Sequence, residues 1–120
     1  MIVEDEEDIL NLYSDYLSSR GFDVVSCSQL ANNIVTNFEE YKPDFCLIDH
    51  MLGGRGIGID TATKILEKNP LTAILFITAY ESMMDELPKH HEFDDKNIRV
   101  LIKPARLSEI ENSMLNMLSS

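Results

Sequence analysis

The stretch Pro43-Asp44-Phe45-Cys46-Leu47-Ile48-Asp49 decides the fold class of this 120-residue chain. Its apolar run, from Phe45 to Ile48, shows no alternation of polar and apolar positions. A strand of this kind is buried on both faces, which is typical of a parallel sheet covered by helices on either side. A carboxylate, Asp49, follows the run directly. We therefore predict a central parallel strand that ends in an acidic residue.

Short apolar runs and amphipathic segments alternate along the rest of the chain. Strands are predicted at residues 1–3, 22–25, 45–48, 72–77 and 98–102, and helices at residues 8–20, 30–41, 59–68, 81–91 and 108–118. Pro88 interrupts the fourth helical pattern. Five strand–helix units indicate an α/β fold with a doubly wound five-stranded parallel sheet, flavodoxin-like, in the strand order 2-1-3-4-5. Residues 1–120 are expected to form one domain.

The last predicted helix has a recognisable beginning and a predicted buried face. Ser108-Glu109-Ile110-Glu111 has the form of a capping box, in which a serine side chain and a glutamate three residues later cap the helix start. The apolar side chains that follow at helical spacing predict a buried face made of Ile110, Met114, Leu115 and Leu118.

Composition and charge exclude several classes of function. Ten Lys plus Arg stand against 21 Asp plus Glu, a formal net charge of −11. Such a surface repels nucleic acid and anionic membranes, so we expect no direct nucleic-acid partner and no membrane partner. The acidic start of the chain does not resemble a signal peptide, and no apolar run approaches the ~20 residues of a membrane span.

The cysteine and histidine residues indicate a reducing environment and no zinc site. Cys27 and Cys46 form no Cys-x-x-Cys pair and are expected to be small buried residues, so a cytoplasmic location is predicted. The spacing of His50, His90 and His91 matches no standard zinc-ligand pattern.

Polar side chains follow four of the predicted strands. Glu4 and Asp5 follow the first strand, Asp49 the third, Thr78 the fourth and Lys103 the fifth. The carboxyl ends of parallel strands meet at one edge of a sheet, so these side chains should converge. Clustered carboxylates repel one another, and Mg²⁺ relieves that repulsion while binding phosphate oxygens. With a lysine and a hydroxyl beside it, the set indicates a phosphoryl-transfer site with a carboxylate nucleophile.

At these positions the sequence resembles the response-regulator receiver family of two-component signalling, and the resemblance covers nearly the whole chain. It rests on Ile2-Val3-Glu4-Asp5-Glu6, Pro43-Asp44-Phe45-Cys46-Leu47-Ile48-Asp49, Ile77-Thr78-Ala79 and Lys103-Pro104. The resemblance implies that Asp49 is the phosphoacceptor and that Glu4, Asp5, Asp49 and the backbone carbonyl of Met51 hold Mg²⁺. It also implies that Thr78 and Lys103 bind the phosphoryl oxygens, and that the Lys103–Pro104 peptide is cis.

The same resemblance implies a signalling module, phosphorylated on an aspartate, rather than a turnover enzyme. The module would catalyse its own Mg²⁺-dependent phosphorylation from a sensor histidine kinase or phosphotransfer protein, and would later dephosphorylate itself. Phosphorylation would then switch binding to a downstream protein partner or a fused output domain. Two alternatives stay open. One is a degenerate receiver that acts as a constitutive interaction module, and the other is an aspartate-based phosphatase, which usually carries an acid two positions beyond the nucleophile, where this chain has Met51.

One departure from the family pattern bears on signal output. The family normally carries an aromatic residue three positions before the lysine, and this chain has Val100 there. The usual coupling between that aromatic residue and the threonine is therefore not expected. We predict instead that output relies on the loop at residues 78–80 and on the fourth helix.

Overall fold

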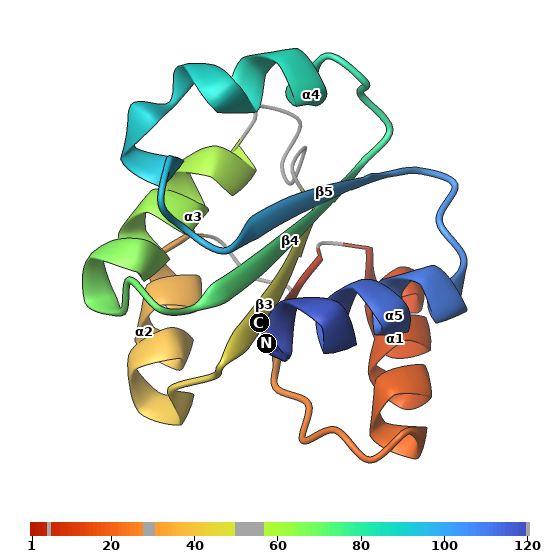
Figure 1. Ribbon diagram of the computed structural model, residues 1–120. Coiled ribbons are helices and arrows are strands. Elements are labelled where there is room, and N and C mark those ends of the chain that lie inside the picture. Colours follow the sequence, from red (N-terminus) through yellow and green to blue (C-terminus); the bar gives the residue numbers. More distant parts are fainter. Residues whose placement is uncertain (5, 28–30, 50–56, 120) are drawn as a thin grey trace.

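The computed structural model describes residues 1–4, 6–27, 31–49 and 57–119, except for the side chains of residues 26, 27, 31–33 and 57. These residues form a five-stranded parallel sheet with helices on both faces (Figure 1). The strand order is β2-β1-β3-β4-β5, with β1 (Ile2–Val3), β2 (Ser26–Cys27), β3 (Phe45–Asp49), β4 (Ala73–Thr78) and β5 (Ile98–Ile102). The helices are α1 (Glu7–Ser19), α2 (Ala31–Tyr41), α3 (Ile57–Lys68), α4 (Met83–Glu86) and α5 (Leu107–Leu118). The predicted fold class, a doubly wound parallel α/β sheet, is confirmed.

The central strands send alternate side chains into two apolar clusters, one on each face of the sheet. On β3, Cys46 and Ile48 pack with α2 and α3, whereas Phe45 and Leu47 pack with α1 and α5. Every residue of β4 is buried. Continuous apolar strands are stable here because helices cover both faces, as Figure 1 shows.

The second strand differs from its prediction. Residues 22–25 were expected to form it, but β2 is Ser26–Cys27, in register with Ile2 and Val3 of β1. A strand needs a paired neighbour, and β1 pairs with this part of the chain only from Ile2 onward, where the Ile2 N–H donates to the carbonyl of Val25 (2.9 Å). Residues 22–25 therefore pack their apolar side chains against the core without forming a ladder.

The fourth helix is shorter than predicted. Residues 81–91 were expected to be helical, but α4 spans only Met83–Glu86 and is followed by two 3₁₀ turns, η2 (Leu87–Lys89) and η3 (His91–Phe93). Pro88 lies in the first of these turns, where its ring and missing N–H prevent the α-helix from continuing. The segment is held to the core by its buried Met83 and Phe93 side chains.

The last helix begins earlier than predicted and buries a different face. Its cap is Arg106 rather than Ser108, because the Glu109 side chain accepts a hydrogen bond from the Arg106 N–H (3.1 Å). The buried side chains are Ile110, Glu111, Met114 and Met117, whereas Leu115 and Leu118 are exposed. The sequence of α5 offers two neighbouring apolar faces, and the face that contains Met117 is the one that packs against the sheet.

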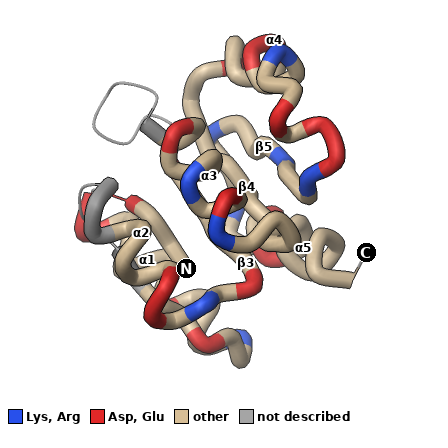
Figure 2. Tube along the Cα trace, turned by 90° about the vertical axis from the view of Figure 1, so that its left-hand side faces the viewer, with Lys and Arg blue, Asp and Glu red and all other residues tan. Residues whose placement is uncertain are grey.

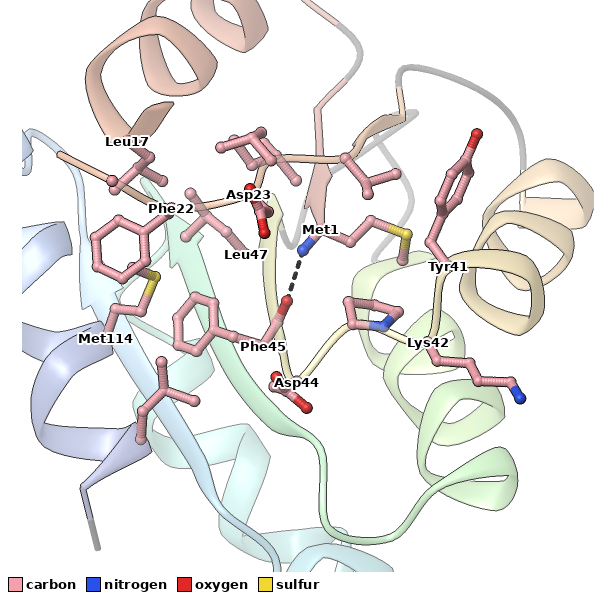
Figure 3. A pocket seen from close by; sticks show the side chains of 16 residues that line it. Met1, Leu17, Phe22, Asp23, Tyr41, Lys42, Asp44, Phe45, Leu47 and Met114 are labelled. Atoms are coloured by element: carbon pink, nitrogen blue, oxygen red, sulfur yellow. Dashed lines mark hydrogen bonds between the residues drawn. The ribbon is translucent and has the colours of Figure 1, made fainter. Parts of the chain in front are cut away.

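The edge of the sheet at which the strands begin is hollowed. A cavity of about 490 Å³ lies between the starts of β1 and β3 and the end of α5, with mainly apolar walls that include Leu17, Phe22 and Met114 (Figure 3). The amino group of Met1 donates to the Phe45 carbonyl at 2.6 Å on its wall. Of the predicted site residues that the structure describes, none lines this cavity. In the part of the chain that the structure describes, no helix is long and apolar enough to cross a membrane.

Candidate functional site

Strand register brings the predicted polar residues to the opposite edge of the sheet. Val3 pairs with Ile48, so Glu4 and Asp49 follow side by side at the ends of β1 and β3. Thr78 ends β4 in register with Ile102 of β5, and Lys103 follows directly. The structure therefore places Glu4, Asp49, Thr78 and Lys103 at one edge, as predicted from strand order alone.

Lys103 is fixed to the site at both its backbone and its side chain. Its N–H donates to the Thr78 carbonyl (2.7 Å), and its Nζ donates to Asp49 Oδ2 (3.1 Å). The side chain of Asp49 is only 14% exposed, so the carboxylate is largely shielded from solvent, whereas that of Lys103 is 30% exposed and remains partly accessible to water. The peptide bond that follows, Lys103–Pro104, is cis, as predicted.

Glu4 is a buried carboxylate, with only 2% of its surface exposed. Its Oε1 accepts a hydrogen bond from the Glu6 N–H (3.1 Å). Burial, reinforced by the charge of Asp49 and a hydrogen bond with its side chain, raises the pKa of Glu4 to about 7, although the Glu6 hydrogen bond and Lys103 act in the opposite direction. Among the described residues, this edge of the sheet thus concentrates negative charge that Lys103 only partly balances.

Thr78 places a hydroxyl beside this charge cluster. The residue is fully buried, and its Oγ1 accepts a hydrogen bond from the Tyr80 N–H (3.1 Å). A hydroxyl that accepts through its oxygen still has its own proton to donate. Thr78 can therefore donate a hydrogen bond to an anion at the edge of the sheet.

The charge of Lys103 is set by competing effects. Partial burial acts to lower its pKa, but the hydrogen bond and charge of Asp49, with a contribution from Glu4, outweigh burial and raise it. The lysine is therefore held as an ammonium group against Asp49. A carboxylate with a fixed ammonium and a hydroxyl at its side suits transfer of an anionic group to the carboxylate.

Comparison with known families shows to which family the chain belongs. The family described as response regulator receiver domain matches residues 1–114. The chain belongs to this family. Three solved structures illustrate the likeness. A response regulator receiver domain protein from Clostridium thermocellum has a TM-score of 0.83 at 19% identity, covering 98% of this chain and 91% of that one.

Two further receiver domains share the fold along nearly their whole length. The PhyR receiver domain from Erythrobacter litoralis has a TM-score of 0.78 at 24% identity, covering 98% of this chain and 88% of that one. The signal receiver domain of a modulated diguanylate cyclase from Desulfovibrio desulfuricans has a TM-score of 0.77 at 25% identity, with 98% and 90% covered. Receiver domains interact with kinases or phosphotransfer proteins and with output domains.

Magnesium is the metal that receiver domains typically bind. The described residues of this receiver domain fit such an ion, because Glu4 and Asp49 offer adjacent carboxylate oxygens, the ligands that Mg²⁺ prefers. The other two predicted ligands, Asp5 and the Met51 carbonyl, lie outside the described residues. Among the residues that the structure does describe, no group of three or more His, Cys, Asp or Glu side chains is placed to hold a metal.

One neighbour of the receiver site was missed by the sequence analysis. Tyr13 of α1 lies close enough to interact electrostatically with Lys103, Glu4 and Asp49, and burial raises its pKa above the usual value. In the sequence it is one of several apolar or aromatic residues at helical spacing, which predicts core packing. No local signal in the sequence distinguishes an aromatic ring that lies beside Lys103 from one in the core.

Proposed function

We propose that the chain is the phosphoacceptor domain of a two-component response regulator, with Asp49 as the residue that receives the phosphoryl group. The contact between Lys103 Nζ and Asp49 Oδ2, at 3.1 Å beside the buried Glu4, is the observation that carries this proposal. The donor would be the phosphohistidine of a sensor histidine kinase or of a phosphotransfer protein. The phosphorylated state would change binding to a downstream protein or a fused output domain.

The reaction follows from the groups at the sheet edge. A carboxylate oxygen of Asp49 attacks the phosphorus, the P–N bond to the donor imidazole breaks, and the imidazole nitrogen leaves with the electron pair. After transfer, the Lys103 ammonium binds a phosphoryl oxygen in place of the carboxylate oxygen. The Thr78 hydroxyl donates a hydrogen bond to a second phosphoryl oxygen. When bound by Glu4, Asp5, Asp49 and the Met51 carbonyl, magnesium would supply further positive charge to the phosphoryl oxygens.

The extent and location of the module belong to the same proposal. We place residues 1–120 in one domain and the domain in the cytoplasm. The free, fully buried Cys46 suits a reducing compartment. Activity would be limited to self-phosphorylation from a phosphodonor and to self-dephosphorylation.

Intact-mass spectrometry after incubation with acetyl phosphate and Mg²⁺ tests the proposal. We expect one added phosphate, none in the presence of EDTA, and none in the Asp49→Asn variant. Asp44→Asn is the matched control, because Asp44 precedes the same strand at the opposite, exposed end. Full phosphorylation of Asp49→Asn would contradict the assignment of Asp49.

The constitutive interaction module, the principal alternative, makes the opposite prediction. It requires that the wild-type chain takes up no phosphate from either acetyl phosphate or a phosphorylated histidine protein. Val100, which packs against the core cluster where the family has an aromatic residue, is the observation that favours it. The same mass measurement therefore separates the two functions.

A further inference from the structure

Tyr13 lies on α1 at the point where this helix passes the phosphoacceptor site. Its side chain is half-buried and packs against the cluster between the sheet and α5. Its phenol interacts electrostatically with Lys103, Glu4 and Asp49. The proposed reaction assigns no role to this residue.

A surface groove joins Tyr13 to Lys103. The two side chains line it together with Ile9, Leu12, Pro104 and Leu107, and the groove has a volume of about 490 Å³. Lys103 is therefore open to water on this side, as its 30% exposed side chain shows, and Tyr13 is the one aromatic ring on the described walls of the groove.

The backbone of α1 near Tyr13 is held in place from the next turn of the helix. The Tyr16 hydroxyl donates to Glu111 Oε1 (3.0 Å), and Arg20 Nε donates to Glu111 Oε2 (2.8 Å), which ties α1 to α5. By contrast, the Tyr13 hydroxyl makes no hydrogen bond with any described residue. Because the backbone is fixed and the hydroxyl has no hydrogen bond with a described residue, we attribute the role of this side chain to its ring.

We propose that Tyr13 is a positioning residue for Lys103. Its ring restricts the lysine on the groove side, so that the ammonium group stays on Asp49 and, after transfer, on the phosphoryl group. The physical reason is that a lysine has a flexible four-carbon stem and a strongly hydrated head, both of which favour leaving the site when water reaches it. This inference rests on the proposed phosphoacceptor function.

The first test is the rate of phosphorylation by acetyl phosphate and Mg²⁺, followed by intact mass. Tyr13→Ala should lower the rate constant roughly tenfold, since small misplacements of a catalytic group have large effects on rate. Tyr13→Phe, which keeps the ring, should remain within about twofold of wild type by the same reasoning. Leu12→Ala is the matched control, because Leu12 lies on the same helix and lines the same groove, and it should also leave the rate unchanged.

The second test measures Lys103 directly and needs no phosphoryl transfer. The NMR order parameter of the ¹⁵N-labelled Lys103 ammonium should fall in Tyr13→Ala and be retained in Tyr13→Phe. If Tyr13→Ala lowers the melting temperature substantially, Tyr13→Gln replaces it, because Gln is a good helix former that lacks the ring. Failure of wild type to take up phosphate would refute the proposed function, whereas the lysine measurement still decides the positioning role.

Three results would overturn the inference. An unchanged Lys103 order parameter in Tyr13→Ala would show that the ring does not restrain the lysine. A rate loss in Tyr13→Phe equal to that in Tyr13→Ala would transfer the role to the hydroxyl. An equal loss in Leu12→Ala would show that groove surface in general, and not Tyr13, sets the rate.

Discussion

Glu4 is the residue whose environment differs most between the metal-free protein and the proposed metal-bound state. A carboxylate that is 2% exposed and lies beside Asp49 is more stable protonated than ionised, which is why its pKa rises from 4.5 to about 7. A bound cation would reverse this preference. Near neutral pH the ionised Glu4 carboxylate is therefore unfavourable in the metal-free protein, and a bound cation would offset this cost.

This environment gives a pH prediction for the metal-free protein. Because the folded pKa of Glu4 is raised, its contribution to stability is fully present below about pH 4.5 and is lost as the pH rises through about 7. The loss should be at most roughly 3 kcal/mol in the free energy of unfolding. Urea unfolding in EDTA between these pH values measures this loss. In Glu4→Gln, the free energy of unfolding should depend less on pH.

A magnesium titration completes the test at Glu4. Millimolar Mg²⁺ should raise the melting temperature more at pH 8 than at pH 5.5, because binding requires the ionised carboxylate. Glu40→Gln, which removes an exposed carboxylate of α2, should change neither profile. Equal Mg²⁺ stabilisation of wild type and Glu4→Gln would remove Glu4 from the metal site.

Strand-end position was sufficient to predict from the sequence that four polar residues meet at one edge of the sheet. Glu4, Asp49, Thr78 and Lys103 follow apolar runs, and a parallel sheet brings such ends together. Position along the chain could not predict that Glu111 would be buried, because its partners Tyr16 and Arg20 lie on another helix, 95 and 91 residues away. Burial of a charge depends on such partners, which only the folded structure identifies.

At the scale of elements, this buried carboxylate adds a polar contact to the apolar packing between α1 and α5. The Arg20 guanidinium, and after it the Tyr16 hydroxyl, lower the pKa of Glu111, so the group is ionised and bonded on both oxygens. Since α1 carries Tyr13 and α5 follows Lys103 in sequence, this ion pair holds together two elements that border the site.

Removing the Glu111 carboxylate should therefore lower the stability of the whole domain. Glu111→Ala leaves the Tyr16 hydroxyl and the Arg20 guanidinium without their shared acceptor and should lower the melting temperature measurably. Glu39→Ala is the control, because Glu39 pairs with Lys68 on the surface, with about half of each side chain exposed, and should cost roughly 0–0.5 kcal/mol.

Because the pKa of Glu111 is lowered, its stabilisation is present above the usual glutamate pKa and is lost as the pH falls through the lowered value. Equal melting temperatures for Glu111→Ala and wild type would contradict this account.

The shortened α4 predicts where the phosphorylation signal travels. Val100 has no aromatic ring to reorient, whereas Thr78 is bonded to the Tyr80 N–H and leads into a segment anchored only by Met83 and Phe93 among its buried side chains. NMR shift changes on phosphorylation should thus be largest in residues 78–95 and smaller in residues 98–102. The reverse ranking would assign the signal to β5.

The elements themselves were predictable to different degrees. The central strands and α1, α2 and α3 follow clear apolar patterns and match within one or two residues. Strand β2 was displaced because pairing with β1, not apolar content, determines where its ladder begins. The face of α5 was misassigned because Met117 and Leu118 are both apolar, and only packing against the sheet distinguishes them.

At the scale of the whole molecule, the two edges of the sheet differ in chemical character. One edge collects carboxylates and a lysine, while the other carries the cavity between β1, β3 and α5, which both apolar and charged side chains line. The strong negative charge is spread over many segments, including the stretch between α4 and β5 (Figure 2). Alternating strands and helices were enough to predict this layered architecture, but the cavity depends on how the ends of the helices pack, which no periodic pattern encodes.

The burial of every residue of β4 has a consequence for how the domain opens. Because β4 is paired on both sides and covered on both faces, its amide protons can exchange with deuterium only when the whole sheet separates. We expect these amides to exchange slowest, with an opening free energy equal to that of global unfolding. The amides of residues 83–93, in short turns near the surface, should exchange orders of magnitude faster. Hydrogen exchange followed by mass spectrometry would show whether this region opens while β4, which ends at Thr78, stays closed.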